Sequence, residues 1–210
     1  RAAENEATTY ALLLAAFGLL LQRSTGQSDL LLGSPVAGRF DPRLAGTLGP
    51  FVDVVPLRLQ VDPGRSFSAL LREVQDGVSD ALGGAELPFS TLVQRLAPPR
   101  SSGRTATLRV VFAWQSLAPG LPAAHRELVA GALGRPVRLG EATWAPRTLD
   151  PPGIAFDLAL TASRSEAGIV FVVETRSDLF AEGSAERMAA NWIALLEDLG
   201  EGREAPRAVA

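Results

Sequence analysis

Residues that could do chemistry are scarce in this chain of 210 residues. It has no cysteine and one histidine, His125, so thiolate nucleophiles, disulfides, cysteine zinc sites and two-histidine metal sites are excluded. His125 lies in a Pro/Gly-rich stretch, where a solvated loop position is favoured over a catalytic one. Asp41, Asp53 and Asp157 are isolated carboxylates, and no neighbouring partner identifies any of them as a general base. No metal site and no complete catalytic motif is predicted.

Composition narrows the class of protein. Hydrophobic residues make up 47% of the chain, charged residues 20%, and the mean hydropathy is +0.15, which indicates a folded domain. The net charge of −3 and the pI near 5.3 argue against a nucleic-acid partner. The longest apolar run, 11–21, is too short to span a bilayer and follows acidic residues. We therefore expect a cytoplasmic protein with no membrane contact.

Helical periodicity and capping residues predict four helices. The first, capped by Thr8 or Thr9, is apolar on most sides and should be buried. The clearest amphipathic pattern follows Ser66, a predicted cap, and includes Leu82 on its apolar face. Ser184 is predicted to cap the last helix. The expected ranges are 10–23, 66–82, 88–96 and 184–199.

Strands are predicted from short apolar runs and from β-branched residues. We expect Gly33-Ser34-Pro35 to break or bend the first strand, and Pro56 to lie at an edge or bulge. The stretch 117–136 reads as a loop with at most a short helix around 125–130. The predicted strands are 30–32, 51–61, 105–114, 137–144 and the antiparallel pair 156–163 and 169–175.

These elements mix helices and strands without strict alternation. The predicted fold class is therefore α/β (α+β), a mixed β-sheet covered by helices. No internal repeat or linker divides the chain, so we expect one unit over residues 1–199 and a tail or linker over 200–210.

Six segments, taken in order, resemble the condensation domains of nonribosomal peptide synthetases. No single segment is specific, but their order and spacing cover nearly the whole chain. They are GQSD (26–29) with GSPVAGR (33–39), LGPFVD (48–53) with LR (57–58), ELPF (86–89) with LV (92–93), the stretch 104–115 ending in VVFAWQ, FDL (156–158) and DLF (178–180).

The resemblance implies one lobe of a two-lobed fold like that of chloramphenicol acetyltransferase. In the family, two carrier proteins deliver pantetheine-bound acyl groups from opposite ends of a tunnel between the lobes. The catalytic signature is two histidines, three spacers and Asp-Gly. It belongs to the N-terminal lobe and is absent here, so this chain resembles the C-terminal lobe.

We therefore expect no catalytic residue in this chain and no activity from it alone. Phosphopantetheine is expected to arrive on carrier proteins, with no cofactor bound directly. The implied partners are the N-terminal lobe, peptidyl carrier proteins and an adjacent adenylation domain.

The same motifs imply roles for four residues. Arg39 matches an arginine that pairs with the signature's aspartate across the lobe interface, with a generic surface position as the alternative. Gln115 matches a glutamine near the tunnel, where its amide could hold a carbonyl oxygen; a solvated strand end is the alternative. Phe51 and Asp53 are assigned to the tunnel, although a core position is favoured for Phe51. Asp53 replaces the family's usual asparagine, exchanging a donor–acceptor for an acceptor-only charge.

Two other interpretations stay open. The chain could be a remnant that lost the catalytic lobe and serves as a structural or docking module. It could also belong among carnitine- or CoA-type acyltransferases, which share the two-lobe fold, although the motifs above favour this less.

Overall fold

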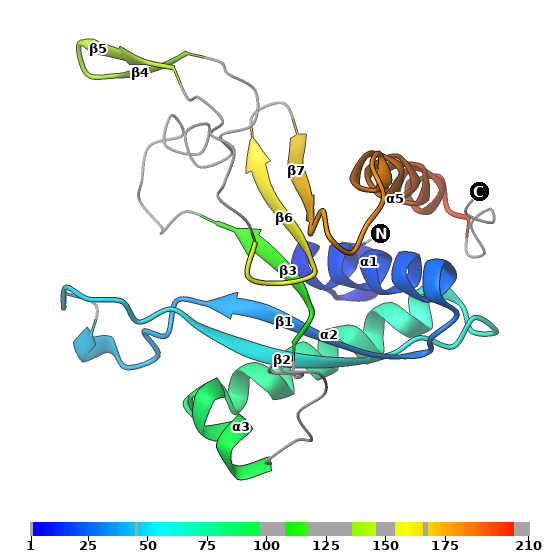
Figure 1. Ribbon diagram of the computed structural model, residues 1–210, viewed down its shortest axis with the longest axis horizontal. Helices are drawn as coiled ribbons and strands as arrows, with labels where there is room; N and C mark the ends of the chain where they lie inside the picture. Colours follow the sequence, from blue (N-terminus) through cyan, green and yellow to red (C-terminus); the bar gives the residue numbers. More distant parts are fainter. Residues whose placement is uncertain are drawn as a thin grey trace.

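The computed structural model describes residues 2–44, 46–96, 108–116, 136–145, 154–165 and 168–203. Within these ranges, a five-stranded mixed sheet has the order β2-β1-β3-β6-β7 (Figure 1). Helices cover it, so the predicted fold class is confirmed. The strands are β1 (Asp29–Val36), β2 (Asp53–Gln60), β3 (Val110–Gln115), β6 (Leu158–Ser165) and β7 (Gly168–Thr175).

Helices α2, α1 and α5 lie side by side over one face of the sheet (Figure 1). Helix α2 packs on β2, α5 packs on β7, and α1 lies between the two helices. Helix α3 lies against β2 at the edge of the sheet. The bounds are α1 (Thr9–Thr25), α2 (Phe67–Gly83), α3 (Phe89–Leu96) and α5 (Ser184–Gly200), with short 3-10 turns η1 (Ala3–Asn5) and η2 (Pro42–Leu44).

Helix α1 is the centre of the core. The Thr8 side chain accepts a hydrogen bond from the Ala11 N–H at 3.1 Å, and Gly26 ends the helix with φ of 72°. Its residues 13–21 are all buried, because α1 is enclosed by α2, α5 and the sheet. The predicted cap and the predicted burial on most sides are confirmed.

Helix α2 follows its predicted pattern, and its last turn is the more exposed part. The Ser66 hydroxyl accepts from the Ala69 N–H at 3.2 Å, as a cap does. Its apolar face buries Phe67, Leu70, Leu71, Val74 and Val78. Leu82 lies on the same side, where it lines a pocket with Val78 and Val55, but it is 45% exposed.

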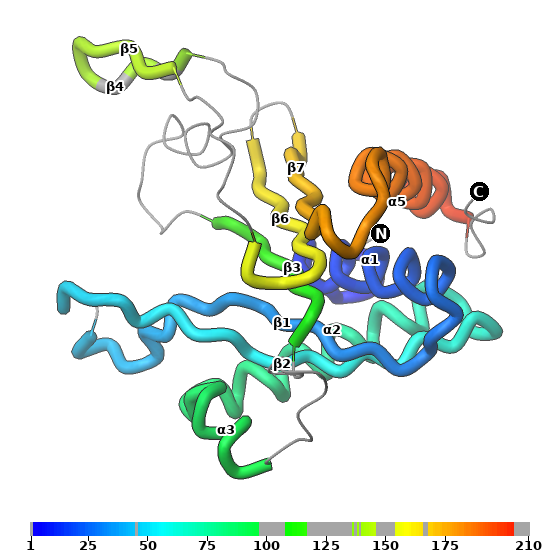
Figure 2. The backbone as a smooth tube through the Cα atoms, in the orientation of Figure 1, coloured from blue at the N-terminus to red at the C-terminus, as the bar shows by residue number. Residues whose placement is uncertain are grey.

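A short parallel pairing between β1 and β3 joins the two halves of the sheet, β2-β1 and β3-β6-β7. Strands β1 and β2 pair antiparallel along their full length, and β3 pairs with β6 along its length. Between β1 and β3, only Leu32↔Val110 and Gly33↔Val111 pair. Beyond Gly33 the two strands diverge, and the β1–β2 connection with η2 projects past the rest of the sheet (Figure 2).

This divergence explains why one predicted strand break is wrong. Strand β1 continues through Gly33, Ser34 and Pro35 to Val36, and Pro35 pairs with Val54. Past Gly33, β1 has a partner only on its β2 side, so it behaves as an edge strand, where proline is tolerated. Pro56 lies in β2, which is an edge strand as predicted.

Two local predictions are also corrected. The single strand expected over 137–144 is a hairpin of β4 (Val137–Leu139) and β5 (Ala142–Trp144), which turns at Gly140 with φ of 61°. The cap of α5 is Gly183, and the Ser184 hydroxyl instead accepts from Arg187 Nη2 at 2.9 Å. The hairpin predicted over 156–175 is confirmed as β6 and β7. His125, the loop 117–135 and the tail 204–210 lie outside the described residues.

Aromatic side chains of the sheet pack against aromatic side chains of the helices. Phe112 of β3 is fully buried, with its ring centroid 5.5 Å from Tyr10 and 6.0 Å from Phe17, both of α1. Trp192 of α5 is also fully buried and meets Phe171 of β7 edge-on at 4.7 Å. These contacts hold the middle helix, α1, and the outer helix α5 on the sheet.

Candidate functional site

Arg39 organises the loop that follows β1. Its Nη1 donates hydrogen bonds to the carbonyl oxygens of Leu44 and Thr47, the latter at 2.8 Å, and Nη2 donates to the Gly49 carbonyl at 3.3 Å. The guanidinium carbon lies 4.4 Å from the ring centroid of Phe51. No carboxylate of the described residues forms an ion pair with Arg39. Within this part of the chain, the positively charged guanidinium contacts neutral carbonyl oxygens and the Phe51 ring.

Phe51 is part of this loop cluster and not of the core. Its ring lies against Arg39 and Gly49, and the residue is half-buried outside the hydrophobic cluster. The core position favoured from sequence is therefore wrong. Gly38 has φ of 65°, and a Cβ placed there would lie 1.7 Å from the Phe51 carbonyl oxygen. The close approach of these two backbone segments requires glycine at position 38.

Asp53 joins β2 to α3. Its Oδ1 accepts from the Val54 N–H at 2.8 Å, and its Oδ2 accepts from the Phe89 N–H at 2.9 Å. Phe89 is the first residue of α3, where backbone N–H groups lack partners within the helix and negative charge is favourable. Two acceptor oxygens suit this position, which accounts for an aspartate here.

We expect Asp53→Ala to lower the free energy of unfolding by about 1–2 kcal/mol, because it leaves two backbone N–H groups without their acceptor. Asp53→Asn retains one acceptor oxygen and should lose about half as much. Urea unfolding measures both. Equal stability of the alanine variant and the parent would show that Asp53 does not hold α3.

Gln115 ends β3 on the sheet face away from the helices. Its exposed side chain lines a hollow of about 270 Å³ together with Thr161 and Ser163 of β6 and Val170 and Glu174 of β7. The sheet register explains this grouping, because Gln115, Ser163 and Val170 occupy one row across three strands. Thr161 and Glu174 follow in the next two rows on the same face.

The structure brings together three of the four predicted site residues. All three lie at the end of the β1–β2 hairpin: Arg39 contacts Phe51, and Asp53 is the first residue of β2, where its carboxylate binds Val54 and Phe89. Gln115 lies at the matching end of β3, because β1 and β3 run parallel, but it makes no contact with that cluster among the described residues. Their assignment to a tunnel and to a lobe interface stays a prediction.

The isolated carboxylates considered as bases have partners. Asp41 binds Arg43 through Nε at 2.8 Å and through Nη2. Asp157 forms an ion pair with Arg109 and lies 3.8 Å from Arg176 Nη1. These pairings and that of Asp53 indicate structural roles for all three.

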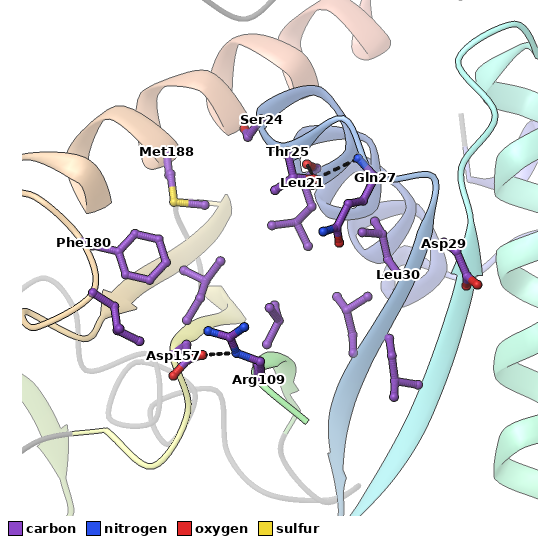
Figure 3. Close-up of a pocket in the computed structure, with 15 residues that line it drawn as sticks. Leu21, Ser24, Thr25, Gln27, Asp29, Leu30, Arg109, Asp157, Phe180 and Met188 are labelled. Carbon is purple, nitrogen blue, oxygen red and sulfur yellow. Dashed lines mark hydrogen bonds and ion pairs between the residues drawn. The ribbon is translucent and has the colours of Figure 1, made fainter. Parts of the chain in front are cut away.

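A larger pocket was not predicted from the sequence. It measures about 700 Å³, within the range of small-molecule sites, and lies where β1, β3 and β6 begin, between the ends of α1 and α5 (Figure 3). Leu21 and Leu30 on one side face Phe180 and Met188 on the other, and the Arg109–Asp157 pair closes one end. The FDL and DLF motifs at 156–158 and 178–180 contribute to its wall. These two motifs together were the sequence signal that could have indicated this pocket.

A small pocket of about 200 Å³ lies where β1 and β3 diverge, with Val55, Leu57 and Trp114 among its walls. Here the Tyr10 hydroxyl and the Ser34 hydroxyl share a hydrogen bond of 2.7 Å. Burial raises the pKa of the Tyr10 hydroxyl above its usual value of 10.0, and this exceeds the opposing effect of the bond to Ser34.

Tyr10 is the sole tyrosine of the sequence, so its titration can be followed without interference. Because the folded-state pKa is raised, the contribution of Tyr10 to the free energy of unfolding should be constant below pH 10 and fall as pH rises further, where the tyrosine of the unfolded chain ionises first. Phenolate absorbance of the folded protein should appear at higher pH than in denaturant. The Tyr10→Phe variant should lack this slope, and phenolate absorbance at the same pH in both states would contradict the prediction.

Neither a metal site nor a membrane span is found in the part of the chain that the structure describes. No group of three or more His, Asp or Glu side chains converges there. No described helix is both long enough and apolar enough to cross a bilayer.

Comparison with known proteins identifies the family. The model of the family described as "Condensation domain" matches residues 1–208. This chain belongs to the condensation domain family. Among its relatives are nonribosomal peptide synthetases: it is 37% identical over 196 residues to phosphinothricin tripeptide synthetase PhsB of Streptomyces viridochromogenes, covering 93% of this chain and 16% of that protein. It is 30% identical over 205 residues to surfactin synthase subunit 1 of Bacillus subtilis, covering 98% and 5%.

Solved structures agree on the fold of this condensation-domain chain. It superposes with a TM-score of 0.84 and 22% identity on holo-AB3403, a four-domain nonribosomal peptide synthetase bound to AMP and glycine, covering 99% of this chain and 16% of that one. The condensation domain of the monacolin K polyketide synthase MokA gives a TM-score of 0.75 at 21% identity, covering 98% and 44%. The chain thus spans less than half of that condensation-domain structure and a small part of its curated relatives.

Proposed function

We propose that this chain is the C-terminal lobe of a nonribosomal peptide synthetase condensation domain. With an N-terminal lobe it would form amide bonds between carrier-protein-bound acyl and aminoacyl thioesters. The observation that carries the proposal is coverage: the family model matches 1–208, yet the chain spans 44% of the MokA condensation domain. The sequence has one histidine, so a two-histidine signature must come from another segment.

In this proposal the chain supplies half of the tunnel and part of the carrier-protein surface. The phosphopantetheine arm arrives on carrier proteins and leaves with them, and an adenylation domain adjoins the lobe in a cytoplasmic assembly. Gln115, an exposed amide at the end of β3, would face the thioester path. Phe51 would line it beside Arg39. Asp53 would act indirectly, by holding α3 in place.

Arg39 is the residue best suited to meet the other lobe. Its guanidinium is half-buried and fixed by the carbonyl oxygens of Leu44, Thr47 and Gly49, which are neutral acceptors. Its Nε makes no hydrogen bond with the described residues. A carboxylate from the N-terminal lobe would neutralise this prepositioned charge, and an arginine keeps its charge at any physiological pH.

The test is complementation. Amide-bond formation is measured between donor- and acceptor-loaded carrier proteins, with this chain alone and with the N-terminal lobe of a related condensation domain added. We expect no product from the chain alone and product when the lobe is supplied. No product in either case, with no binding between the lobes, would overturn the proposal.

Arg39→Ala should reduce product formation in the complemented system by about tenfold or more, since it leaves a buried carboxylate of the other lobe unpaired. Arg43→Ala is the matched control, because Arg43 lies in the same loop and pairs with Asp41 alone at the surface. Equal losses in the two variants would remove the lobe-interface role of Arg39.

A second candidate is a non-catalytic docking module. The chain shares its fold, at a TM-score of 0.71 and 24% identity, with the X-domain from teicoplanin biosynthesis, which has also been solved in complex with OxyB. No nucleophile–base pair is present among the described residues. Firm binding of the N-terminal lobe without any product would favour this alternative.

A further inference from the structure

The pocket of about 200 Å³ between the sheet and the helices adjoins two of the predicted site residues. Val36, the last residue of β1, lines it and is followed closely in the chain by Arg39. Trp114 of β3 also lines it and comes directly before Gln115. The pairing of β1 with β3 ends at Gly33, and the pocket lies where the two strands diverge. It is therefore at the ends of the two strands that lead to the proposed thioester path.

The walls of this pocket come from both layers of the fold. On the sheet side, Ser34 of β1 pairs with Val55 of β2, so their side chains lie next to each other on the face that carries the helices. On the helix side, Val78 and Leu82 of α2 are one turn apart and share a face. Strands and helices hold these side chains more precisely than loops would, as a binding subsite needs.

The chemistry of the pocket is apolar apart from one pair of hydroxyls. The Tyr10 and Ser34 hydroxyls bind each other at 2.7 Å, and Ser34 is 6% exposed. No charged side chain of the described residues lines the pocket. A charged group entering it would lose its hydration without gaining a partner of opposite charge, which is unfavourable. The pocket therefore suits an uncharged and mainly apolar group.

The size of the pocket limits how much of a ligand can enter. Its volume is below the roughly 300–1,000 Å³ of sites that enclose a whole small molecule, and far above the roughly 30 Å³ that one water occupies. One side chain or a short acyl chain therefore fits. Leu82 is 45% exposed and Pro35 is also exposed, so the pocket can be reached from solvent.

We propose that this pocket binds the apolar side chain of an aminoacyl substrate. The inference rests on the proposed function for the nature of the substrate, and the pocket would hold the side chain of a thioester bound at the ends of β1 and β3. Burial of about 60 Å² of apolar surface in such a pocket corresponds to about a tenfold gain in affinity.

The experiment measures binding to this chain directly, without condensation. The probes are N-acetylcysteamine thioesters of glycine, norleucine and lysine, which carry no side chain, an unbranched apolar one, and a similar chain that ends in an ammonium. We expect the norleucine probe to bind about tenfold more tightly than either of the others. Titration followed by NMR gives each dissociation constant.

Two signals locate the binding. Tyr10 is the sole tyrosine of the sequence and lines the pocket, so ring-labelled tyrosine gives one NMR signal that reports on it. The three tryptophans, labelled with fluorine, provide a second reporter with internal controls. The signal of Trp114 should shift with the norleucine probe. Those of Trp144, in the β4–β5 hairpin, and Trp192, fully buried in α5, should not.

Variants that fill the pocket assign the selectivity to it. Leu82→Phe, from the helix side, and Val36→Phe, from the sheet side, should weaken the norleucine probe about tenfold and leave the glycine probe unchanged. Leu31→Phe is the matched control, because Leu31 is also 45% exposed but lines the larger pocket. Far-ultraviolet circular dichroism checks that each variant is folded.

Equal binding of the norleucine and glycine probes, or of the norleucine and lysine probes, overturns the proposal. So does no binding of any probe, or a norleucine preference that survives in both filled variants. Failed complementation with norleucine selectivity intact at Tyr10 would count against the proposed function and not against this site. Successful complementation without that selectivity would count against the site alone.

Discussion

Replacing Gly38 by alanine should lower the free energy of unfolding by about 3 kcal/mol, since it combines a left-handed backbone with an overpacked contact. Gly38 has φ of 65°, and an added Cβ would lie 1.7 Å from the Phe51 carbonyl oxygen. That neighbour is backbone and cannot rotate away, so the loop between β1 and β2 must change shape. Arg39, the next residue, would lose the geometry that holds its guanidinium.

The matched control is Gly26→Ala. Gly26 has φ of 72°, close to that of Gly38, but no atom lies within 4 Å of an added Cβ. This variant should cost about 1 kcal/mol, from the backbone conformation alone. Urea unfolding of both variants separates conformation from contact. If the two losses are equal, the approach of Phe51 to Gly38 does not determine the residue at this position.

The second large effect is expected from Phe112→Ala, at about 3–5 kcal/mol. The Phe112 ring is fully buried and packs between Tyr10 and Phe17, so its removal leaves a cavity where the sheet meets α1. A loss of this size is comparable with the whole stability of many domains, about 5–15 kcal/mol. Thermal and urea unfolding of the variant should show a large drop in both midpoints.

A surface phenylalanine provides the comparison. Phe40 is 43% exposed in the loop after β1, and Phe40→Ala should cost well under half as much as Phe112→Ala. Should Phe112→Ala prevent folding altogether, Phe112→Leu retains most of the apolar volume and keeps the loss measurable. A change at Phe112 no larger than that at Phe40 would contradict the central place of this ring in the core.

Elements whose pattern is local were predictable from the sequence. The apolar spacing in 66–82 and the polar turn between 163 and 169 are properties of neighbouring residues, and α2 and the β6–β7 hairpin follow them. Gly33-Ser34-Pro35 was predicted to break or bend the first strand, whereas β1 continues through it. Proline is tolerated there because β1 no longer has β3 as a neighbour. That is a feature of the sheet and leaves no trace in nearby residues.

The candidate site likewise has features that the sequence predicted and features that depend on the folded structure. The motif around Arg39 predicted a functional position, but the contacts of Arg39 with Leu44, Thr47 and Gly49 depend on how the loop closes. Glu174 was not singled out, because it occupies an ordinary polar position in a strand. The register of β3, β6 and β7 places it on the sheet face of Gln115, in the hollow that both residues line.

The two-pair junction between β1 and β3 also has a consequence for how the chain folds. Strands β6 and β7 pair with residues close in the sequence, whereas Leu32 and Gly33 must find Val110 and Val111 far along the chain. Distant pairings cost more chain entropy and form later, so closing this junction should limit the folding rate. An added Cβ at Gly33 would meet Val54, Leu108 and Val111 within 3.3 Å. In stopped-flow experiments, Gly33→Ala should therefore slow refolding more than it speeds unfolding, and the reverse would place the junction after the barrier.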